Sequence, residues 1–224
     1  MSGAATFKTA TGLLRTLGAQ PQPFSMMKPR TRRVEFDIAV PPKWTTEVTQ
    51  SLARVFNTEL AGGRPETVLQ AFIDPSYGRG GATLACNTQL ASVGDALLAL
   101  QLDDLVSRHN DLDAVRSGAV APLATAAARN LVLSDECLGT LANHVWGVGG
   151  LVLTGRGVEA LGALGAPHRA HRLRTDPVPP DAAARAARAL VAAAYLNHDL
   201  AFVAAFIQRH VLRPSLALSA APLQ

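Results

Sequence analysis

The alanine-rich stretch from residue 182 to residue 194 is the feature that most constrains how this chain can fold. Alanine has the highest intrinsic helix propensity, so this stretch predicts a helix. Pro177, Pro179 and Pro180 stand just before it and predict the preceding loop. No strong run of residues alternates between apolar and polar as a half-buried strand does. The sequence therefore predicts an all-α fold.

Apolar residues at helical intervals predict three further helices. The stripes consist of Trp44, Val48, Leu52 and Val55; of Leu90, Val93, Leu97 and Leu100; and of Leu200, Val203, Ile207 and Val211. We expect the first helix to be entered through Thr45 or Thr46, and Asn197 or Asp199 to cap the last. Leu97 and Tyr195 are expected in the core.

Size and composition agree with a single folded domain. The chain has 224 residues, 48% of them hydrophobic. It can therefore bury one sizeable core. No apolar run is long enough to span a bilayer. Cys86 and Cys137 form no metal or redox motif, and we expect both to be buried free thiols.

Positive charge is concentrated at the N-terminus. Residues 1–34 contain no acid, and their basic residues are Lys8, Arg15, Lys28, Arg30, Arg32 and Arg33. Because the positive charge of these residues exceeds the net charge of +4 for the whole chain, residues 35–224 carry a slightly negative net charge. An RNA-wrapping domain is expected to be cationic, although a local basic patch fits within a slightly acidic total.

The acid-free N-terminal segment has the composition of a mitochondrial targeting sequence, with basic, hydroxyl and spaced apolar residues. The alternative is a basic arm that binds RNA. We divide the chain into residues 1–33 as targeting segment or basic arm, residues 34–212 as the folded domain, and residues 213–224 as a C-terminal tail.

Three segments, in chain order, resemble the ribonuclease III family. Residues 68–77 resemble the family's Leu-Leu-x-Ala-Leu-Thr-His-Pro-Ser-Tyr segment, with Asp74 in place of the histidine. Residues 87–98 resemble the signature Asn-Glu-Arg-Leu-Glu-Phe-Leu-Gly-Asp-Ala-Val-Leu, and residues 185–196 resemble Asp-x-x-Glu-Ala-Leu-Ile-Gly-Ala-x-Tyr-Leu. The resemblance implies a ribonuclease III-like helical domain.

The resemblance also implies that the catalytic metal site is degenerate. The family's carboxylate positions correspond here to Thr88, Ala91, Asp95, Arg185 and Arg188, and loosely to Ala121. Magnesium needs oxygen ligands, whereas arginine offers only donors and stays charged. We therefore expect no metal, no cofactor and no enzymatic activity. Taken alone, two arginines three residues apart on a helix are also typical of a solvated face.

Two departures from the family bear on partners. A double-stranded-RNA-binding domain normally follows the nuclease domain, but the chain ends soon after the resemblance does, so we expect no such domain here. The family's dimer forms around the signature helix, where a phenylalanine inserts into the partner, and Ser92 stands at that position. The lost aromatic area argues against an ordinary homodimer and leaves open a heterodimer with a second ribonuclease III-like protein.

Together these features resemble the degenerate ribonuclease III-like proteins of the mitochondrial large ribosomal subunit. We expect a structural component of the mitochondrial matrix that binds rRNA and neighbouring ribosomal proteins. The RNA-binding candidates are Arg30, Arg32, Arg33, Arg169, Arg172 and Arg174.

Three alternatives stay open. One is a non-catalytic partner subunit of a mitochondrial RNA-processing or editing nuclease complex. Another is a surviving metal nuclease that uses Asp103 or Asp104. The third is a Ser-His-Asp hydrolase, which composition alone allows, although the sequence contains no Gly-x-Ser-x-Gly motif.

Residues 147–152 do not match the glycine pattern of a dinucleotide-binding loop. They predict a helix stop followed by a turn.

Overall fold

The computed structural model describes residues 40–41, 43–56, 60, 64–77, 86–109, 126–155 and 177–220, all within the unit Glu35–Gln224. Most of these residues are helical, and none of them belongs to a named strand. The prediction of an all-α fold is thus confirmed for this part of the chain. No helix among the same residues is long and apolar enough to cross a membrane.

Helical elements follow one another along the described ranges. In chain order they are α2 (Trp44–Phe56), α3 (Pro65–Gln70), η1 (Pro75–Tyr77), α4 (Thr88–His109), α6 (Ala126–Val132), α7 (Asp135–Thr140), η3 (Leu141–Val145), η4 (Gly149–Leu151), α10 (Pro180–Asn197), α11 (Leu200–Phe206), η5 (Ile207–Leu212) and α12 (Arg213–Ala220). The elements η1 and η4 are 3-10 turns, whereas η3 and η5 are π-helical segments that continue α7 and α11.

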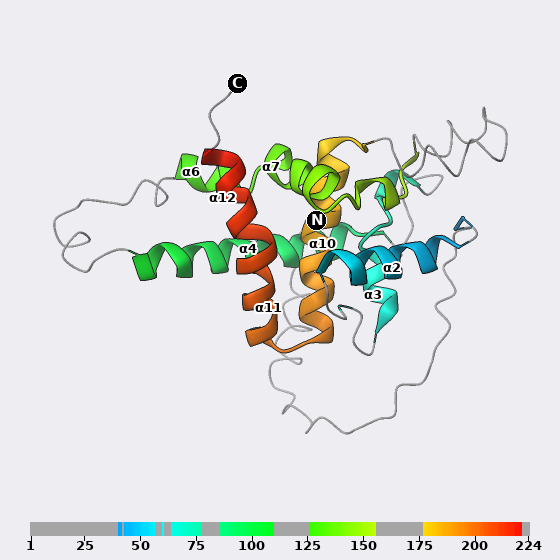
Figure 1. The fold of residues 1–224 in the computed structure, drawn as a ribbon, viewed down its shortest axis with the longest axis horizontal. Helices are drawn as coiled ribbons and strands as arrows, with labels where there is room; N and C mark the ends of the chain where they lie inside the picture. Colours follow the sequence, from blue (N-terminus) through cyan, green and yellow to red (C-terminus); the bar gives the residue numbers. More distant parts are fainter. Residues whose placement is uncertain are drawn as a thin grey trace, which may run out of the picture. The chain divides into compact units, whose positions relative to one another are not determined.

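Helix α10 forms the centre of this unit. It packs most extensively against α4 and α7, and Figure 1 shows α10 crossing α4. From Ala182 to Ala194 every side chain is buried except those of Arg185 and Arg188. The alanine-rich sequence thus supplies helix propensity together with side chains small enough for close helix packing. Pro180, expected in the loop, is instead the first residue of α10, where its missing N–H has no cost.

The crossing of α4 and α10 depends on Gly94. A Cβ atom at this position would collide with the backbone of Arg188. Glycine therefore allows the two helices to approach closely, and Asp95, the next residue, reaches the Arg188 side chain. Gly94 is buried at this contact.

The apolar stripe predicted on α4 faces mostly outward, which corrects that prediction. Leu90 is buried, but Val93 is 44% exposed, Leu100 is 55% exposed, and Leu97 is half-buried. The buried side of α4 instead contains the small residues Ala91 and Gly94, followed by Leu98, Leu102 and Val106. Close packing against α10 selects the small residues, whereas the hydrophobic pattern points to the larger ones.

Helix α2 matches its predicted stripe except at the ends. Trp44, Val48 and Leu52 are buried, and Phe56 is buried in preference to Val55. Entry through Thr45 or Thr46 is wrong, because the helix already begins at Trp44. The preceding residue, Lys43, has a φ of 67°. A residue in the left-handed region therefore turns the chain into the helix.

The far end of α2 packs into an aromatic cluster. The ring centroid of Phe56 lies 5.1 Å from that of Trp146, 5.2 Å from that of Phe206 and 5.1 Å from that of His210. Trp146 Nε1 donates to the carbonyl oxygen of His210 at 3.1 Å. Partial burial, with a smaller effect from Arg209, lowers the pKa of His210 below its ordinary value.

The C-terminal helices show which cap is used. The Asp199 carboxylate accepts from the backbone N–H of Phe202 at 2.7 Å. Asp199 therefore caps α11 and is the correct one of the two predicted caps, Asn197 and Asp199. Of the stripe expected behind it, Val203, Ile207 and Val211 are buried and Leu200 is exposed. Residues 213–220, expected as a tail, form α12, which contacts α6 and α7.

Both cysteines are free, as expected, but neither is fully buried. The Cys137 thiol lies near the α12 backbone, 3.7 Å from the Ser215 carbonyl oxygen. Each thiol therefore lies at the edge of the packed interior rather than inside it.

Candidate functional site

The candidate site lies where the two arginines of α10 meet α4, α7 and the segment before η1. The side chains of Arg185 and Arg188 make ion pairs with Asp74, Asp95, Asp135 and Asp181. We call these six residues the α10 ion-pair cluster. Neither arginine is a merely solvated residue on the outer face of its helix.

Arg188 joins three elements of the fold. Its Nε donates to Asp95 Oδ1 on α4 at 3.1 Å, and its Nη1 donates to Asp135 Oδ1 at the start of α7 at 2.6 Å. Its Nη2 donates to the carbonyl oxygen of Leu133 at 2.7 Å. All three guanidinium nitrogens thus have acceptors within the chain.

Helix α7 fixes the position of Asp135. Ser134 caps this helix, because its hydroxyl accepts from the backbone N–H of Cys137 at 3.1 Å. A serine at this position satisfies a helix N–H that has no partner within the helix. Asp135 therefore stands in the first turn, where a negative charge also interacts favourably with the helix dipole.

Arg185 pairs with the carboxylate of Asp74, and its Nη2 lies 3.7 Å from Asp181 Oδ2 one turn earlier on α10. The Asp74 side chain is only 4% exposed. Its other oxygen, Oδ1, accepts from the Ser76 backbone N–H at 2.9 Å and from the Ser76 hydroxyl at 2.6 Å. Asp74 is therefore a buried carboxylate whose two oxygens both have donors.

Backbone hydrogen bonds hold Asp74 in place. Its N–H donates to the Leu153 carbonyl oxygen at 3.0 Å, next to the isolated parallel bridge between Ile73 and Leu153. On the other side, Asn87 donates its backbone N–H to Ile73 at 2.8 Å and its side-chain amide to Ala71 at 3.0 Å. The segment leading to Asp74 is thus fixed independently of Arg185.

A hollow of about 340 Å³ opens beside the Asp74–Arg185 pair. Its lining includes Ser76, Thr154 and Asp181.

Burial raises the pKa of Tyr77, the last residue of η1, so its hydroxyl stays protonated near neutral pH.

Two further positions that the sequence analysis singled out lie on α4. On α4, Thr88 is exposed and Ala91 is buried, so neither position offers a carboxylate to Asp95. Within the described ranges, no group of three or more His, Cys, Asp or Glu residues is placed to hold a metal ion. The carboxylates of Asp74, Asp95 and Asp135 are instead paired with the two arginines.

The aspartates of the alternative metal-nuclease hypothesis are also paired with arginines. Asp103 lies 3.0 Å from Arg129 Nη1 of α6, and Asp104 lies 3.0 Å from Arg108 Nη2 one turn later. Each pair is at least partly exposed to solvent. A metal ion would have to displace these guanidiniums.

Several predicted sites lie outside the described residues. These are the RNA-binding candidates Arg30, Arg32, Arg33, Arg169, Arg172 and Arg174, together with the targeting segment 1–33 and the loose carboxylate position Ala121.

Sequence reasoning missed the acceptors of the two arginines. Asp135 follows Ser134, and serine is a residue type that favours the N-cap of a helix. The separation of 53 residues between Asp135 and Arg188 nevertheless hides the pairing. The Leu133 carbonyl oxygen carries no sequence signal at all. Asp181 was detectable, because it stands four residues before Arg185 on the same helix.

No family model matches this chain, and the searches of curated proteins and of solved structures gave no match either. The functional assignment therefore depends on the residues and contacts described above.

Proposed function

We propose that this protein is a degenerate ribonuclease III-like domain that acts as a non-catalytic structural component of the mitochondrial large ribosomal subunit. In this proposal it resides in the mitochondrial matrix and binds rRNA and neighbouring ribosomal proteins. The observation that supports it best is the α10 ion-pair cluster, in which guanidiniums stand at two of the expected metal-ligand positions and pair with carboxylates of the same chain.

Chemistry explains why such a site would not cleave RNA. Two-metal phosphodiester cleavage needs several carboxylates to hold the ions, and here Arg188 already engages Asp95. The carboxylates of the cluster also outnumber its guanidiniums, so the face does not attract phosphate. Arg185 and Arg188 are therefore assigned to internal stabilisation, and RNA contacts are assigned elsewhere.

The test of inactivity uses the purified chain with double-stranded RNA and magnesium or manganese. We expect no cleavage, with an active ribonuclease III as the positive control. Specific cleavage that disappears in Asp95→Ala would contradict the proposal.

Sedimentation of mitochondrial extract tests the ribosomal assignment. We expect the protein to migrate with the large subunit and to leave that position when the subunit is dissociated. Migration with a smaller particle that contains a nuclease would instead support a partner subunit of an RNA-processing or editing complex.

The outward stripe of α4 supports a protein partner, whether the chain belongs to the ribosomal subunit or to an RNA-processing complex. Val93, Leu97 and Leu100 lie at helical spacing on one side of α4, and Val93 and Leu100 are exposed. We infer that a neighbouring protein, such as a second ribonuclease III-like chain, covers this stripe. Val93→Lys with Leu100→Lys should then abolish incorporation into the particle, whereas Val145→Lys, at another exposed apolar residue, should not.

Import tests the assignment of the N-terminal segment. Deleting residues 1–33 should prevent mitochondrial import, because these residues supply the basic, acid-free composition of a targeting sequence. Normal import of the shortened chain would show that the segment is a basic arm.

A further inference from the structure

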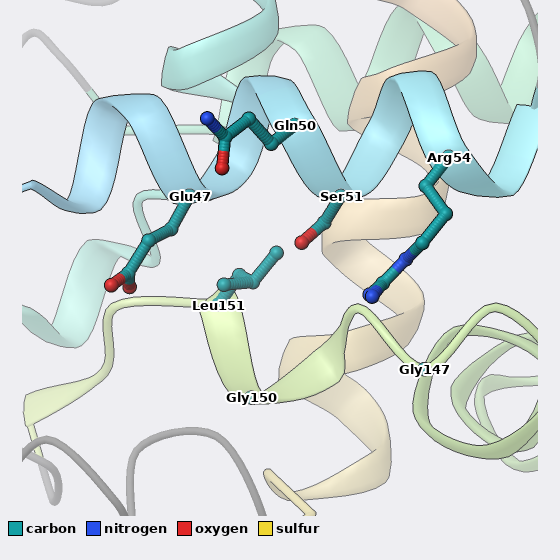
Figure 2. A pocket seen from close by; sticks show the side chains of 7 residues that line it. All are labelled: Glu47, Gln50, Ser51, Arg54, Gly147, Gly150 and Leu151. Carbon is teal, nitrogen blue, oxygen red and sulfur yellow. The ribbon is translucent and has the colours of Figure 1, made fainter.

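A polar cleft of about 460 Å³ lies between α2 and the loop that follows η3. Helix α2 contributes Glu47, Gln50, Ser51 and Arg54; opposite them lie Gly147 of the loop and Gly150 and Leu151 of the 3-10 turn η4. Figure 2 shows Ser51 and Arg54 pointing from α2 toward the glycine-containing loop, with Glu47 farther along the same helix.

Packing fixes both walls of this cleft. Trp44 Nε1 donates to the Leu151 carbonyl oxygen at 2.8 Å, which ties the start of α2 to the loop. At the other end of α2, Phe56 packs against Trp146, the residue before Gly147. The cleft is therefore preformed, because both of its walls are held by the packed interior.

The loop presents open backbone to the cleft. Gly147 has a φ of 65°, and no atom lies within 4 Å of the position that its Cβ would occupy. A ligand can approach this backbone closely, which a side chain at the same position would prevent.

Arg54 differs from the arginines of α10 in having no acceptor among the described residues. Its guanidinium is exposed and makes no ion pair with any of them. Five N–H donors therefore remain available beside the Ser51 hydroxyl and the Gln50 amide. A guanidinium with neighbouring neutral donors is chemistry that suits a phosphate group.

Glu47 limits which phosphate ligand fits. It stands about two helical turns before Arg54, on the same side of α2. A carboxylate repels a second phosphate but accepts a hydrogen bond from a sugar hydroxyl. Because a carboxylate has about four acceptor positions, a contact elsewhere does not use up this capacity.

We propose that this cleft holds one ribose-phosphate unit of RNA, with Arg54 and Ser51 at the phosphate and Glu47 at the ribose hydroxyl. This inference rests on the proposed RNA-binding function and locates a contact on α2. A ribose hydroxyl is also the group that distinguishes RNA from DNA. A peptide ligand fits less well, since Leu151 is the one apolar side chain among the described lining residues and offers little area to bury.

Fluorescence anisotropy with the full chain tests the proposal. The probes are a labelled single-stranded RNA, DNA of the same sequence, and AMP and a glutamate-rich peptide as competitors. The variants are Arg54→Gln and Glu47→Gln, with Arg213→Gln as control, since Arg213 is likewise exposed and forms no ion pair with any described residue but lies on α12.

We expect RNA to bind more tightly than DNA and Arg54→Gln to weaken RNA binding about tenfold while reducing the salt slope by about 0.7, as loss of one phosphate contact requires. Arg213→Gln should change neither quantity. Glu47→Gln should reduce the difference in binding affinity between RNA and DNA.

Four outcomes would overturn the proposal. If Arg54→Gln binds RNA with the affinity of the wild-type chain, the RNA contact lies elsewhere and the proposed function still stands. If neither the wild-type chain nor any variant binds RNA, the proposed function is contradicted as well. AMP binding as tightly as the RNA oligomer would make free nucleotide the ligand. If the glutamate-rich peptide displaces the RNA at a concentration comparable to that of the RNA, and Arg54→Gln no longer binds the peptide, the ligand of the cleft is a peptide.

Discussion

Arg185 and Arg188 stand three residues apart on α10, yet their ion pairs lie in different surroundings. Arg185 pairs with Asp74, whose side chain is 4% exposed, whereas Arg188 pairs with Asp95 and Asp135, which are 60% and 57% exposed. A buried carboxylate that loses its partner keeps the cost of its desolvation, whereas an exposed one returns to water. We therefore expect burial of the partner, rather than the number of hydrogen bonds, to decide which arginine contributes more to stability.

Reversing both charges should have the largest effect. Arg185→Asp with Arg188→Glu places new carboxylates beside Asp74, Asp95 and Asp135. We expect the free energy of unfolding to fall by about 4 kcal/mol or more, since breaking a buried pair alone typically costs about 3 to 5 kcal/mol. Urea denaturation followed by circular dichroism measures this change.

The control for this variant reverses Arg54 and Arg213, which make no ion pairs with the described residues, to Asp and Glu. That variant should unfold close to the wild-type urea concentration. Equal stability of the two reversed proteins would mean that the α10 ion-pair cluster does not stabilise the fold.

Removing only Arg185 should have the next largest effect. Arg185→Gln leaves Asp74 buried with Ser76 as its remaining donor. We expect a loss of about 2 to 3 kcal/mol, below the full cost of a broken buried pair because Arg185 itself reaches solvent. A loss below that of Arg188→Gln would reverse the comparison.

Removing only Arg188 should cost less, although this side chain makes more hydrogen bonds. We expect Arg188→Gln to lower the free energy of unfolding by about 1 kcal/mol, because both of its carboxylate partners become hydrated. Thermal unfolding of Arg185→Gln and Arg188→Gln in parallel, at low and at high salt, checks the order. Salt should reduce the effect at Arg188 more, since exposed pairs are screened more strongly.

The smallest effect concerns His210, away from both arginines. Burial lowers its folded-state pKa, so the unfolded chain binds the proton more readily. The associated stability is present above the ordinary histidine pKa and is lost as pH falls through the lowered one. His210→Gln should flatten the decline in stability below neutral pH, and an unchanged pH dependence would contradict this.

Local patterns predicted the helices but not their neighbours. The alanine-rich stretch and the stripe beginning at Trp44 mark α10 and α2, because helical periodicity is encoded within a few turns. The stripe on α4 was assigned to the wrong side, since Gly94 and Ala91 carry little hydrophobic signal but allow the close crossing with α10. Tyr195, expected in the core, is exposed near the end of α10.

The sequence singled out two arginines of α10 but not the residues that they contact. Arg185 and Arg188 stood out in the sequence because they fall within one of the segments that resemble ribonuclease III. Apart from Asp181, their acceptors come from segments 53 to 111 residues away, and Leu133 contributes a backbone oxygen that no pattern reveals. Long-range pairing of this kind depends on the tertiary fold, so a single sequence does not contain it in readable form.

A double-mutant cycle between Asp74 and Arg185 tests most directly the central claim that the α10 ion-pair cluster stabilises the fold. The cycle compares Asp74→Asn, Arg185→Gln and the double variant with the wild-type chain by urea denaturation. We predict a coupling of about 2 kcal/mol, so that the double variant is far more stable than the sum of the single losses implies. Additive losses, with coupling near zero, would show that the two residues do not stabilise the fold as a pair and would contradict the account.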